Sequence, residues 1–160
     1  MMLRKRLRQM TIRDAAEAER AALESLQRRS SDVWEAYRED LAANPDAIDL
    51  PLAFIANGWV RVAVDRDDRP MGFSVVIPTG GEAHELDGLF VEPAHMYRGV
   101  GRALVQDAAA RAAHAAAACL EVTAGPAQGF YEKLGFTVTG HADTRFGPAM
   151  RMRRELTRGA

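Results

Sequence analysis

Residues 89–104 read LFVEPAHMYRGVGRAL, and this stretch decides the fold because it joins a strand to a helix. The apolar residues at its start run to Val91, and Pro93 favours the end of a strand there. From Gly99 onward the chain is rich in alanine, which predicts a long helix to about residue 118. A strand, a glycine-containing turn and a long helix are typical of the crossover in a mixed sheet.

The turn itself predicts an anion site. At a helix start the first amide N–H groups have no partner within the helix, and the helix dipole adds positive potential. Gly99 and Gly101 let a ligand approach the backbone, while Arg98 and Arg102 bring positive charge. No Lys-Ser/Thr pair follows the glycines and a third glycine is missing, so this is neither a Walker loop nor a good dinucleotide fingerprint. A plain glycine-containing helix start stays the alternative.

Outward from this stretch, the periodicity of apolar residues predicts further helices and strands. Helices are expected from Thr11 or Asp14 to about Arg28, over 32–41 with Asp32 as N-cap, over 99–118 and over 127–134. Strands are expected over 59–64, 71–77, 84–91, 119–123, 136–141 and 149–156, with 3–10 a short basic start and a loop or helical turn between Pro45 and Pro51. The fold class is therefore α/β (α+β), with one parallel strand pair across the crossover.

Composition limits the function classes. The 160 residues fit a single domain over 1–160, and the net charge of −1 argues against a general nucleic-acid binder. The one cysteine excludes a disulfide framework and a zinc site built on paired cysteines, and no metal is expected. No apolar run approaches the roughly 18 residues of a membrane span, and the basic N-terminus lacks the apolar stretch of a secretory signal. A cytoplasmic protein without a membrane partner is expected.

A second block, FYEKLGF at 130–136, follows the strand that comes after the long helix. Phe130 and Leu134 form an apolar pair on a short helix, and Gly135 can end that helix. Tyr131 lies on a different face. A packed aromatic ring with its hydroxyl bound to backbone is the structural alternative for this tyrosine.

Three blocks in this order, ELDGLFVEP at 85–93, RGVGRAL at 98–104 and FYEKLGF at 130–136, resemble the GCN5-related N-acetyltransferase (GNAT) family. The resemblance extends over about residues 7–157. It implies the GNAT fold, a mixed and mostly antiparallel sheet of six to seven strands flanked by about four helices, with a βαβ crossover at the coenzyme A site. It also implies an acyltransferase that moves an acetyl group from acetyl-CoA to a primary amine of a small molecule or peptide.

The resemblance carries donor-binding roles onto matching positions. The strand before the turn would pair its backbone with the pantetheine arm, and the turn would hold the pyrophosphate. The implied donor contacts are Leu89, Phe90, Val91, Met96, Tyr97, Arg98, Gly99, Val100, Gly101, Arg102, Ala103 and Phe130. Met96 departs from the usual polar residue, and 124–126 lacks the asparagine that often contacts the donor.

Direct transfer needs three groups. A lysine-like amine is mostly protonated at neutral pH, so a base must take its proton. Asp87 is the first candidate for that base and Glu85 the second, while solvated strand charges stay the alternative for both. The thioester oxygen gains charge and needs an N–H, expected near Phe90 or Val91. The resemblance implies Tyr131 as the acid that protonates the leaving thiolate.

The family places acceptor contacts on its first two helices and its last strands, which here suggests Ser30, Trp34, Tyr37 and Arg145. For Trp34 and Tyr37, simple packing of the helix on the sheet stays the alternative. Residues 32–92 hold 13 acidic and 4 basic side chains, which would attract a cationic amine. An acyl-CoA sensor without turnover and a nucleotide-binding module stay open as other functions. Because dimers are frequent in the family, a homodimer is a further expectation.

Overall fold

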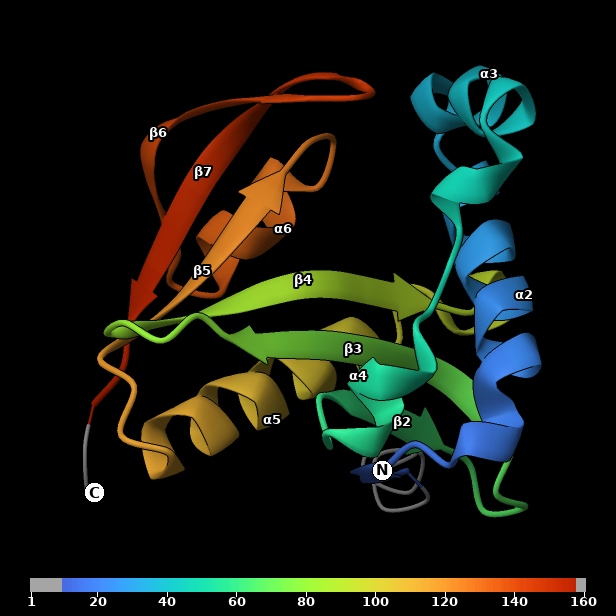
Figure 1. Ribbon diagram of the computed structural model, residues 1–160, viewed down its shortest axis with the longest axis horizontal. Coiled ribbons are helices and arrows are strands. Elements are labelled where there is room, and N and C mark those ends of the chain that lie inside the picture. Colours follow the sequence, from blue (N-terminus) through green and yellow to red (C-terminus); the bar gives the residue numbers. More distant parts are fainter. Residues whose placement is uncertain (1–9, 158–160) are drawn as a thin grey trace. The chain divides into compact units, whose positions relative to one another are not determined.

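The computed structural model describes residues 10–157, without the side chains of residues 35 and 36 (Figure 1). Its strands are β1 (Thr11–Asp14), β2 (Val60–Val64), β3 (Pro70–Pro78), β4 (Ala83–Val91), β5 (Cys119–Ala124), β6 (Thr137–Thr144) and β7 (Gly147–Glu155). Its α-helices are α2 (Arg20–Asp32), α3 (Glu35–Ala43), α4 (Leu52–Ala56), α5 (Val100–His114) and α6 (Gln128–Lys133). Short 3₁₀ helices are η1 (Glu17–Glu19), η2 (Pro45–Ala47) and η3 (Pro93–His95).

The strands are hydrogen-bonded in the order β1-β2-β3-β4-β5-β7-β6. β4 and β5 are parallel, and α5 connects them, as the glycine turn predicted. The pairs β1–β2, β2–β3, β5–β7 and β6–β7 are antiparallel. The prediction of a mixed and mostly antiparallel sheet with one crossover is therefore confirmed.

The described residues form two compact units. The first comprises the described residues up to Val75 together with Gly88–Leu104, and the second comprises Val76–Asp87 together with the described residues from Val105 on. β3, β4 and α5 each contribute to both units, because the boundary passes through them. The prediction of one domain over residues 1–160 stays a prediction.

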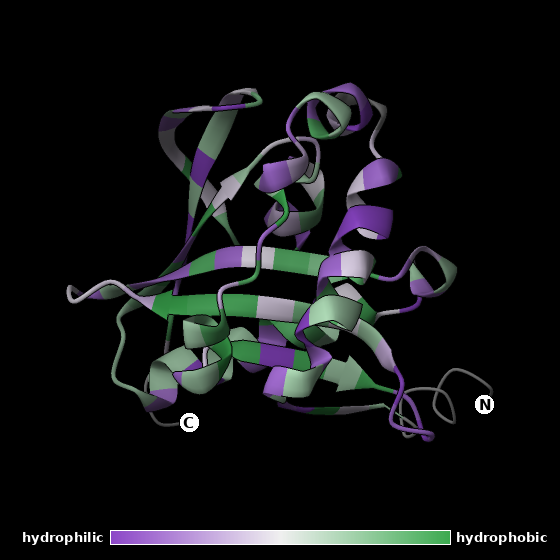
Figure 2. Cartoon of the chain, turned by 45° about the vertical axis from the view of Figure 1, so that its right-hand side comes forward, coloured by the Kyte–Doolittle hydropathy of each residue, from purple (hydrophilic) through white to green (hydrophobic). Residues whose placement is uncertain are grey.

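The first unit is built on apolar strands. In Figure 2 its strands carry much of the green of apolar residues, whereas α2 shows long purple stretches. Residues 71–75 of β3 are all buried. One cluster of its core joins the end of β4 to the start of α5: Ala63, Met71, Val100 and Leu104 are buried, with Leu89 and Val91 packed against them. The residues before and after the glycine turn thus share one core.

The second unit is centred on β5, β7 and β6, which lie side by side in Figure 1. Leu120 and Val122 of β5 and Met152 of β7 are at most 3% exposed, so one face of the middle strands is apolar. The edge strand β6 is mostly exposed along its length. The unit also includes α6, which precedes β6 in the chain.

One predicted helix start is wrong. Residues 11–14 do not open a helix but form β1, which pairs with β2 from Thr11↔Val64 to Asp14↔Arg61. The helix begins at Arg20, after η1, and ends at Asp32. The segment pairs with β2 along its whole length, and the Arg13 guanidinium also binds Glu19 at 2.8 Å and Asp68 at 3.0 Å.

The second helix also starts later than predicted. α3 begins at Glu35, and its N-cap position is Trp34, without a side-chain hydrogen bond. The predicted cap Asp32 is instead the last residue of α2. The segment between the two prolines contains η2 and leads into α4, in line with a helical turn. The predicted extended start at 3–10 lies almost wholly outside the described residues.

Within residues 10–157, no helix is both long enough and apolar enough to span a membrane.

Candidate active site

At the end of β4 the contacts that matter for the site are made by main-chain amides. The Val91 N–H donates to Ser30 Oγ at 3.2 Å, and the next amide, that of Glu92, donates to Met71 O at 2.8 Å. Ser30 lies in the last turn of α2 and is only 6% exposed. The expected amide for the thioester oxygen, near Phe90 or Val91, therefore includes one that is bound to a serine hydroxyl.

A bidentate ion pair holds the same end of the strand. Arg29 Nε and Nη2 each approach a carboxylate oxygen of Glu92 at 2.7 Å. Such fork-to-fork pairs fix orientation as well as charge. The hydrogen bonds with Glu92 raise the pKa of the Arg29 guanidinium. Both oxygens of Glu92 are bound, so the candidates for the base are the two carboxylates earlier in β4, Glu85 and Asp87.

Gly72 of β3 allows a close approach of backbone at this point. A methyl group built on Gly72 would lie 2.8 Å from Phe90 O, 3.1 Å from Val100 Cγ1 and 3.2 Å from Leu104 Cδ1. A side chain there would push against a carbonyl of β4 and against the first turns of α5. The glycine therefore allows β3 to lie close to both the end of β4 and the start of α5.

The turn between β4 and α5 contains two residues in the left-handed region. Tyr97 has φ +62° and Gly99 has φ +88°. The first is unusual for a residue with a side chain, and the Tyr97 ring is 99% exposed. Arg98 and Arg102 are exposed beside the first turn of α5, whose early amides point out along the helix axis. The turn thus has the groups expected of an anion site.

The other predicted residues of the turn lie on less exposed positions. Met96, Gly101 and Ala103 are half-buried, and Val100 is buried. The Ala103 N–H donates to Gly99 O at 3.0 Å, which starts the helical hydrogen bonding. Backbone, rather than the Met96 side chain, is what this turn can offer a phosphate.

In the second unit, Glu85 is bound tightly by an arginine of β7. Arg151 Nη1 and Nη2 donate to the two carboxylate oxygens of Glu85 at 2.7 and 3.0 Å. Arg151 also donates to Glu121 at 2.5 Å and to Thr123 Oγ1 at 2.8 Å. Glu85 and Glu121 stand opposite each other on β4 and β5, so Arg151 relieves a like-charge pair. This commitment makes Glu85 the weaker candidate for the base.

Asp87 lies two residues further along the same face of β4 and is exposed to solvent. Surrounding protein atoms still remove part of its hydration, and this desolvation raises the pKa of the Asp87 carboxyl. The negative charge of Glu85 raises that pKa further. A carboxylate with a raised pKa is a better proton acceptor, which is in line with Asp87 as the first candidate for the base; the choice between Asp87 and Glu85 stays a prediction.

Tyr131 is 7% exposed and sits between two aromatic rings of its own segment. The ring centroids of Phe130 and Phe136 lie 5.1 and 5.4 Å from it, both edge to face. Its carbonyl accepts the N–H of Leu134 at 3.0 Å and that of Phe136 at 3.1 Å, which ends α6. These contacts hold the ring of Tyr131 in one orientation, as an acid in a fixed position requires, and Phe130 is half-buried beside it.

Three of the predicted acceptor residues belong to the first unit and Arg145 belongs to the second. Trp34 is extended and 38% exposed, so it does not share a helical face with Tyr37. Tyr37 is half-buried, and burial raises the pKa of its hydroxyl. Arg145 stacks over Phe146, 5.5 Å from the ring centroid, at the β6–β7 turn. Ser30 binds the Val91 amide, as described above. The acceptor roles of all four residues stay predictions.

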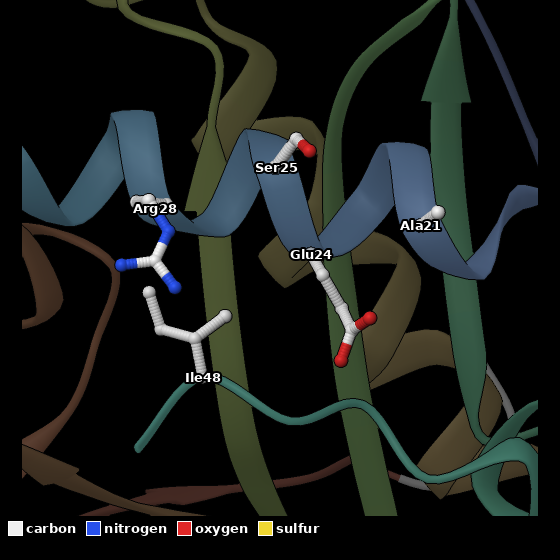
Figure 3. Close-up of a pocket in the computed structure, with 5 residues that line it drawn as sticks. All are labelled: Ala21, Glu24, Ser25, Arg28 and Ile48. Carbon is white, nitrogen blue, oxygen red and sulfur yellow. The ribbon is translucent and has the colours of Figure 1, made fainter. Parts of the chain in front are cut away.

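An open hollow of about 290 Å³ lies beside α2, and none of the predicted acceptor residues lines it (Figure 3). The Glu24 and Arg28 side chains reach from the helix toward the segment that carries Ile48. Glu24 accepts the Leu50 N–H at 2.9 Å, so its charge fastens that segment to α2. The hollow is lined by Ala21, Glu24, Ser25, Arg28 and Ile48.

Two arginines of the candidate site could not be predicted from the sequence. Arg151 lies on a strand without a motif, and its three partners meet only through the register of β4, β5 and β7. Arg29 precedes the predicted Ser30, but its pairing with Glu92 depends on how α2 lies against β4. Among the described residues, no group of three or more His, Cys, Asp or Glu side chains is placed to hold a metal ion.

Comparisons with known proteins support the resemblance. A family model described as an acetyltransferase (GNAT) domain matches residues 57–138. The peptidyl-lysine N-acetyltransferase YjaB of Escherichia coli (strain K12) is 35% identical over 95 residues, 59% of this chain and 60% of that protein. Its namesake in Salmonella typhimurium (strain LT2) is 32% identical over 139 residues, 84% of this chain and 88% of that protein.

Among solved structures, the PaiA N-acetyltransferase of Thermoplasma acidophilum in complex with coenzyme A has the same fold. It superposes with a TM-score of 0.74 at 18% identity, over 91% of this chain and 98% of that one. The chain belongs to the GNAT family of acetyltransferases. The predicted GNAT fold and the predicted acyltransferase class are confirmed, whereas the roles of individual residues stay predictions.

Proposed function

We propose that this chain transfers the acetyl group of acetyl-CoA directly to the side-chain amine of a lysine in a peptide or protein. The observation that carries the donor half is the end of β4, where the strand leads through a left-handed glycine turn into α5. The turn offers helix-start amides to the pyrophosphate, with Arg98 and Arg102 beside them. Membership of the GNAT family supports acetyl-CoA as the co-substrate.

The proposed reaction consists of proton removal, nucleophilic attack, cleavage of the carbon–sulfur bond and protonation of the leaving thiolate. Asp87, directly or through water, takes a proton from the lysine ammonium, which frees the nitrogen lone pair. The nitrogen attacks the thioester carbon, and the oxygen of the tetrahedral intermediate is stabilised by a main-chain N–H of β4. The carbon–sulfur bond then breaks, and the thiolate of coenzyme A takes a proton from Tyr131. The second proton of the nitrogen returns to the Tyr131 oxygen, directly or through water, and Asp87 releases its proton to solvent. The products are the acetylated amine and free coenzyme A.

The choice of a lysine acceptor rests on two observations. Both curated relatives reported above are named for acting on peptidyl-lysine. Residues 32–92, which include β4, hold 13 acidic and 4 basic side chains. Negative potential of this kind raises the local concentration of a cationic peptide. A small-molecule amine is the competing acceptor, since its charge would be attracted in the same way.

Release of free thiol from acetyl-CoA tests the proposal. The acceptor panel contains a lysine peptide, the same peptide with its lysine acetylated, free lysine and a polyamine. The expected result is thiol release with the lysine peptide, none with the acetylated peptide, and a KM that rises with salt. Release with the polyamine alone would assign a small-molecule acceptor. Calorimetric binding of acetyl-CoA without thiol release would instead favour an acyl-CoA sensor.

A further inference from the structure

The turn between β4 and α5 holds a tyrosine ring that is almost wholly in solvent. Tyr97 is 99% exposed, whereas Tyr131 is 7% exposed and Tyr37 is half-buried. A tyrosine ring has a large apolar surface, and folded proteins usually cover a good part of it. Exposure of one apolar side chain is common by itself, so the position of Tyr97 in the chain has to be considered as well.

The backbone of Tyr97 adopts a conformation that disfavours a tyrosine. Its φ of +62° lies in the left-handed region, which residues with a side chain seldom enter. The preceding Met96 is extended, and its N–H donates to Pro93 O at 3.3 Å at the end of η3. Glycine or asparagine would take the left-handed position with less strain. The shape of the turn therefore does not account for the aromatic ring, and strained positions of this kind are frequent at ligand-binding sites.

Tyr97 is next to the groups that the proposed function gives to the pyrophosphate. Arg98 follows it directly and is exposed, and Val100 is the first residue of α5. In coenzyme A the pyrophosphate joins the pantetheine arm to an adenosine. The proposed function places the arm along β4, so the adenosine extends from the other end of the pyrophosphate. Its adenine base is then only a ribose away from the turn that carries the Tyr97 ring.

We infer that Tyr97 is a specificity-determining residue for the donor: its ring stacks on the adenine base of coenzyme A when the pyrophosphate is bound at the start of α5. This inference rests on the proposed function. The base and the ring each have a flat apolar face, and stacking removes both faces from water. Because the ring is 99% exposed, it gives up almost no contact within the protein when it covers the base.

Two calorimetric ligands separate the adenosine from the rest of the donor. Coenzyme A contains the base, whereas 4′-phosphopantetheine contains the arm and one phosphate without it. Tyr97→Asn should bind coenzyme A about 5- to 20-fold more weakly than the wild type, as expected for the loss of one base–aromatic stack. Its binding of 4′-phosphopantetheine should change less than about 2-fold. Asparagine tolerates the left-handed conformation, so this variant removes the ring without adding backbone strain.

Three further variants control for the ring and for the removal of an exposed side chain. Tyr97→Phe keeps the ring and should bind coenzyme A within about 2-fold of the wild type. In Tyr97→Trp, coenzyme A should quench the new indole fluorescence and 4′-phosphopantetheine should not, with the wild type and its two tryptophans as the blank. Leu52→Ala removes another exposed apolar side chain of the first unit and should bind both ligands as the wild type does.

The selectivity between the two ligands decides the outcome. An equal loss for both ligands in Tyr97→Asn would assign the residue to the shape of the turn and overturn the inference. Unchanged binding of coenzyme A by Tyr97→Asn, or an indole in Tyr97→Trp that coenzyme A does not quench, would also overturn it. Any of these results with a wild type that binds coenzyme A leaves the proposed function intact. If the wild type binds no coenzyme A, the proposed function fails, and the inference fails with it.

Discussion

The two halves of β4 lie on one strand but are held by different kinds of group. In the half that belongs to the second unit, side chains do the work: Glu85 is bound through two oxygens to Arg151. In the half that belongs to the first unit, the main chain does it: Phe90 O lies close to Gly72, and the Val91 N–H is bound by Ser30. Substitutions can therefore change the chemistry of the half in the second unit directly. In the half that belongs to the first unit, they can act only through residues that contact its main chain.

Tyr131→Phe should have the largest effect among the substitutions of side chains in the second unit. If Tyr131 protonates the leaving thiolate, loss of its hydroxyl should lower kcat about 100- to 1,000-fold. The ring and its two edge-to-face contacts remain, so the fold and the dissociation constant of coenzyme A should change little. Steady-state thiol release and calorimetry measure the two quantities. A kcat within about 5-fold of the wild type would remove Tyr131 from the role of acid.

Asp87→Asn should lower kcat/KM about 100-fold if Asp87 is the base. A base acts in its deprotonated form, so kcat/KM of the wild type should fall as the pH drops through the raised pKa of Asp87. That acidic limb should lie above the usual range of an aspartate. The pH profile of thiol release measures it.

Glu85→Gln is the matched control on the same face of the strand. It should cost less than 10-fold in kcat/KM, because Glu85 is already committed to Arg151. It should also move the acidic limb to lower pH, since removal of the Glu85 charge lowers the pKa of Asp87. An acidic limb that stays in place in Glu85→Gln, or persists in Asp87→Asn, would assign the base to another group.

Gly72→Ala tests the close approach between β3 and the end of β4 that belongs to the first unit. A methyl group 2.8 Å from Phe90 O must displace backbone, so the free energy of unfolding should fall by about 2–3 kcal/mol. Acetyl-CoA should also bind more weakly, because the carbonyl and the neighbouring amide move together. Gly81→Ala is the control, since its added methyl group meets no described atom within 4 Å. Equal stability of the two variants in urea would show that the close approach is not a constraint.

Most of the fold was predictable because its signals are local. The turn before α5, the order of the strands around it and the positions of β2 to β5 follow from periodicity and glycine placement. β1 was missed because Thr11 and Asp14 are both residue types that cap helices, and only the pairing of this segment with β2 shows that it is a strand. The sequence of a short segment does not show which distant strand it pairs with.

The candidate site likewise contains features that follow from local sequence and features that depend on long-range contacts. The turn between β4 and α5 was predictable because backbone geometry favours glycine and proline at fixed positions. Its role in donor binding came from the family resemblance and stays a prediction. The choice between Glu85 and Asp87 depends on Arg151, which is far along the chain and reaches Glu85 only through the strand register. The bond from Val91 to Ser30 likewise depends on where α2 lies, and the spacing of residues cannot show that.

Ser74→Ala tests whether the first unit contains a buried hydroxyl without a hydrogen-bond partner. Ser74 is fully buried in β3, and its hydroxyl has no hydrogen-bond partner among the described residues. Removing an unsatisfied buried hydroxyl should raise the free energy of unfolding by about 0.5–1.5 kcal/mol. Urea denaturation with an unchanged slope measures the gain, and Ser25→Ala, at an exposed position, should change stability by less than about 0.5 kcal/mol. A loss of stability in Ser74→Ala would instead show that the hydroxyl has a partner and that this buried group stabilises the first unit.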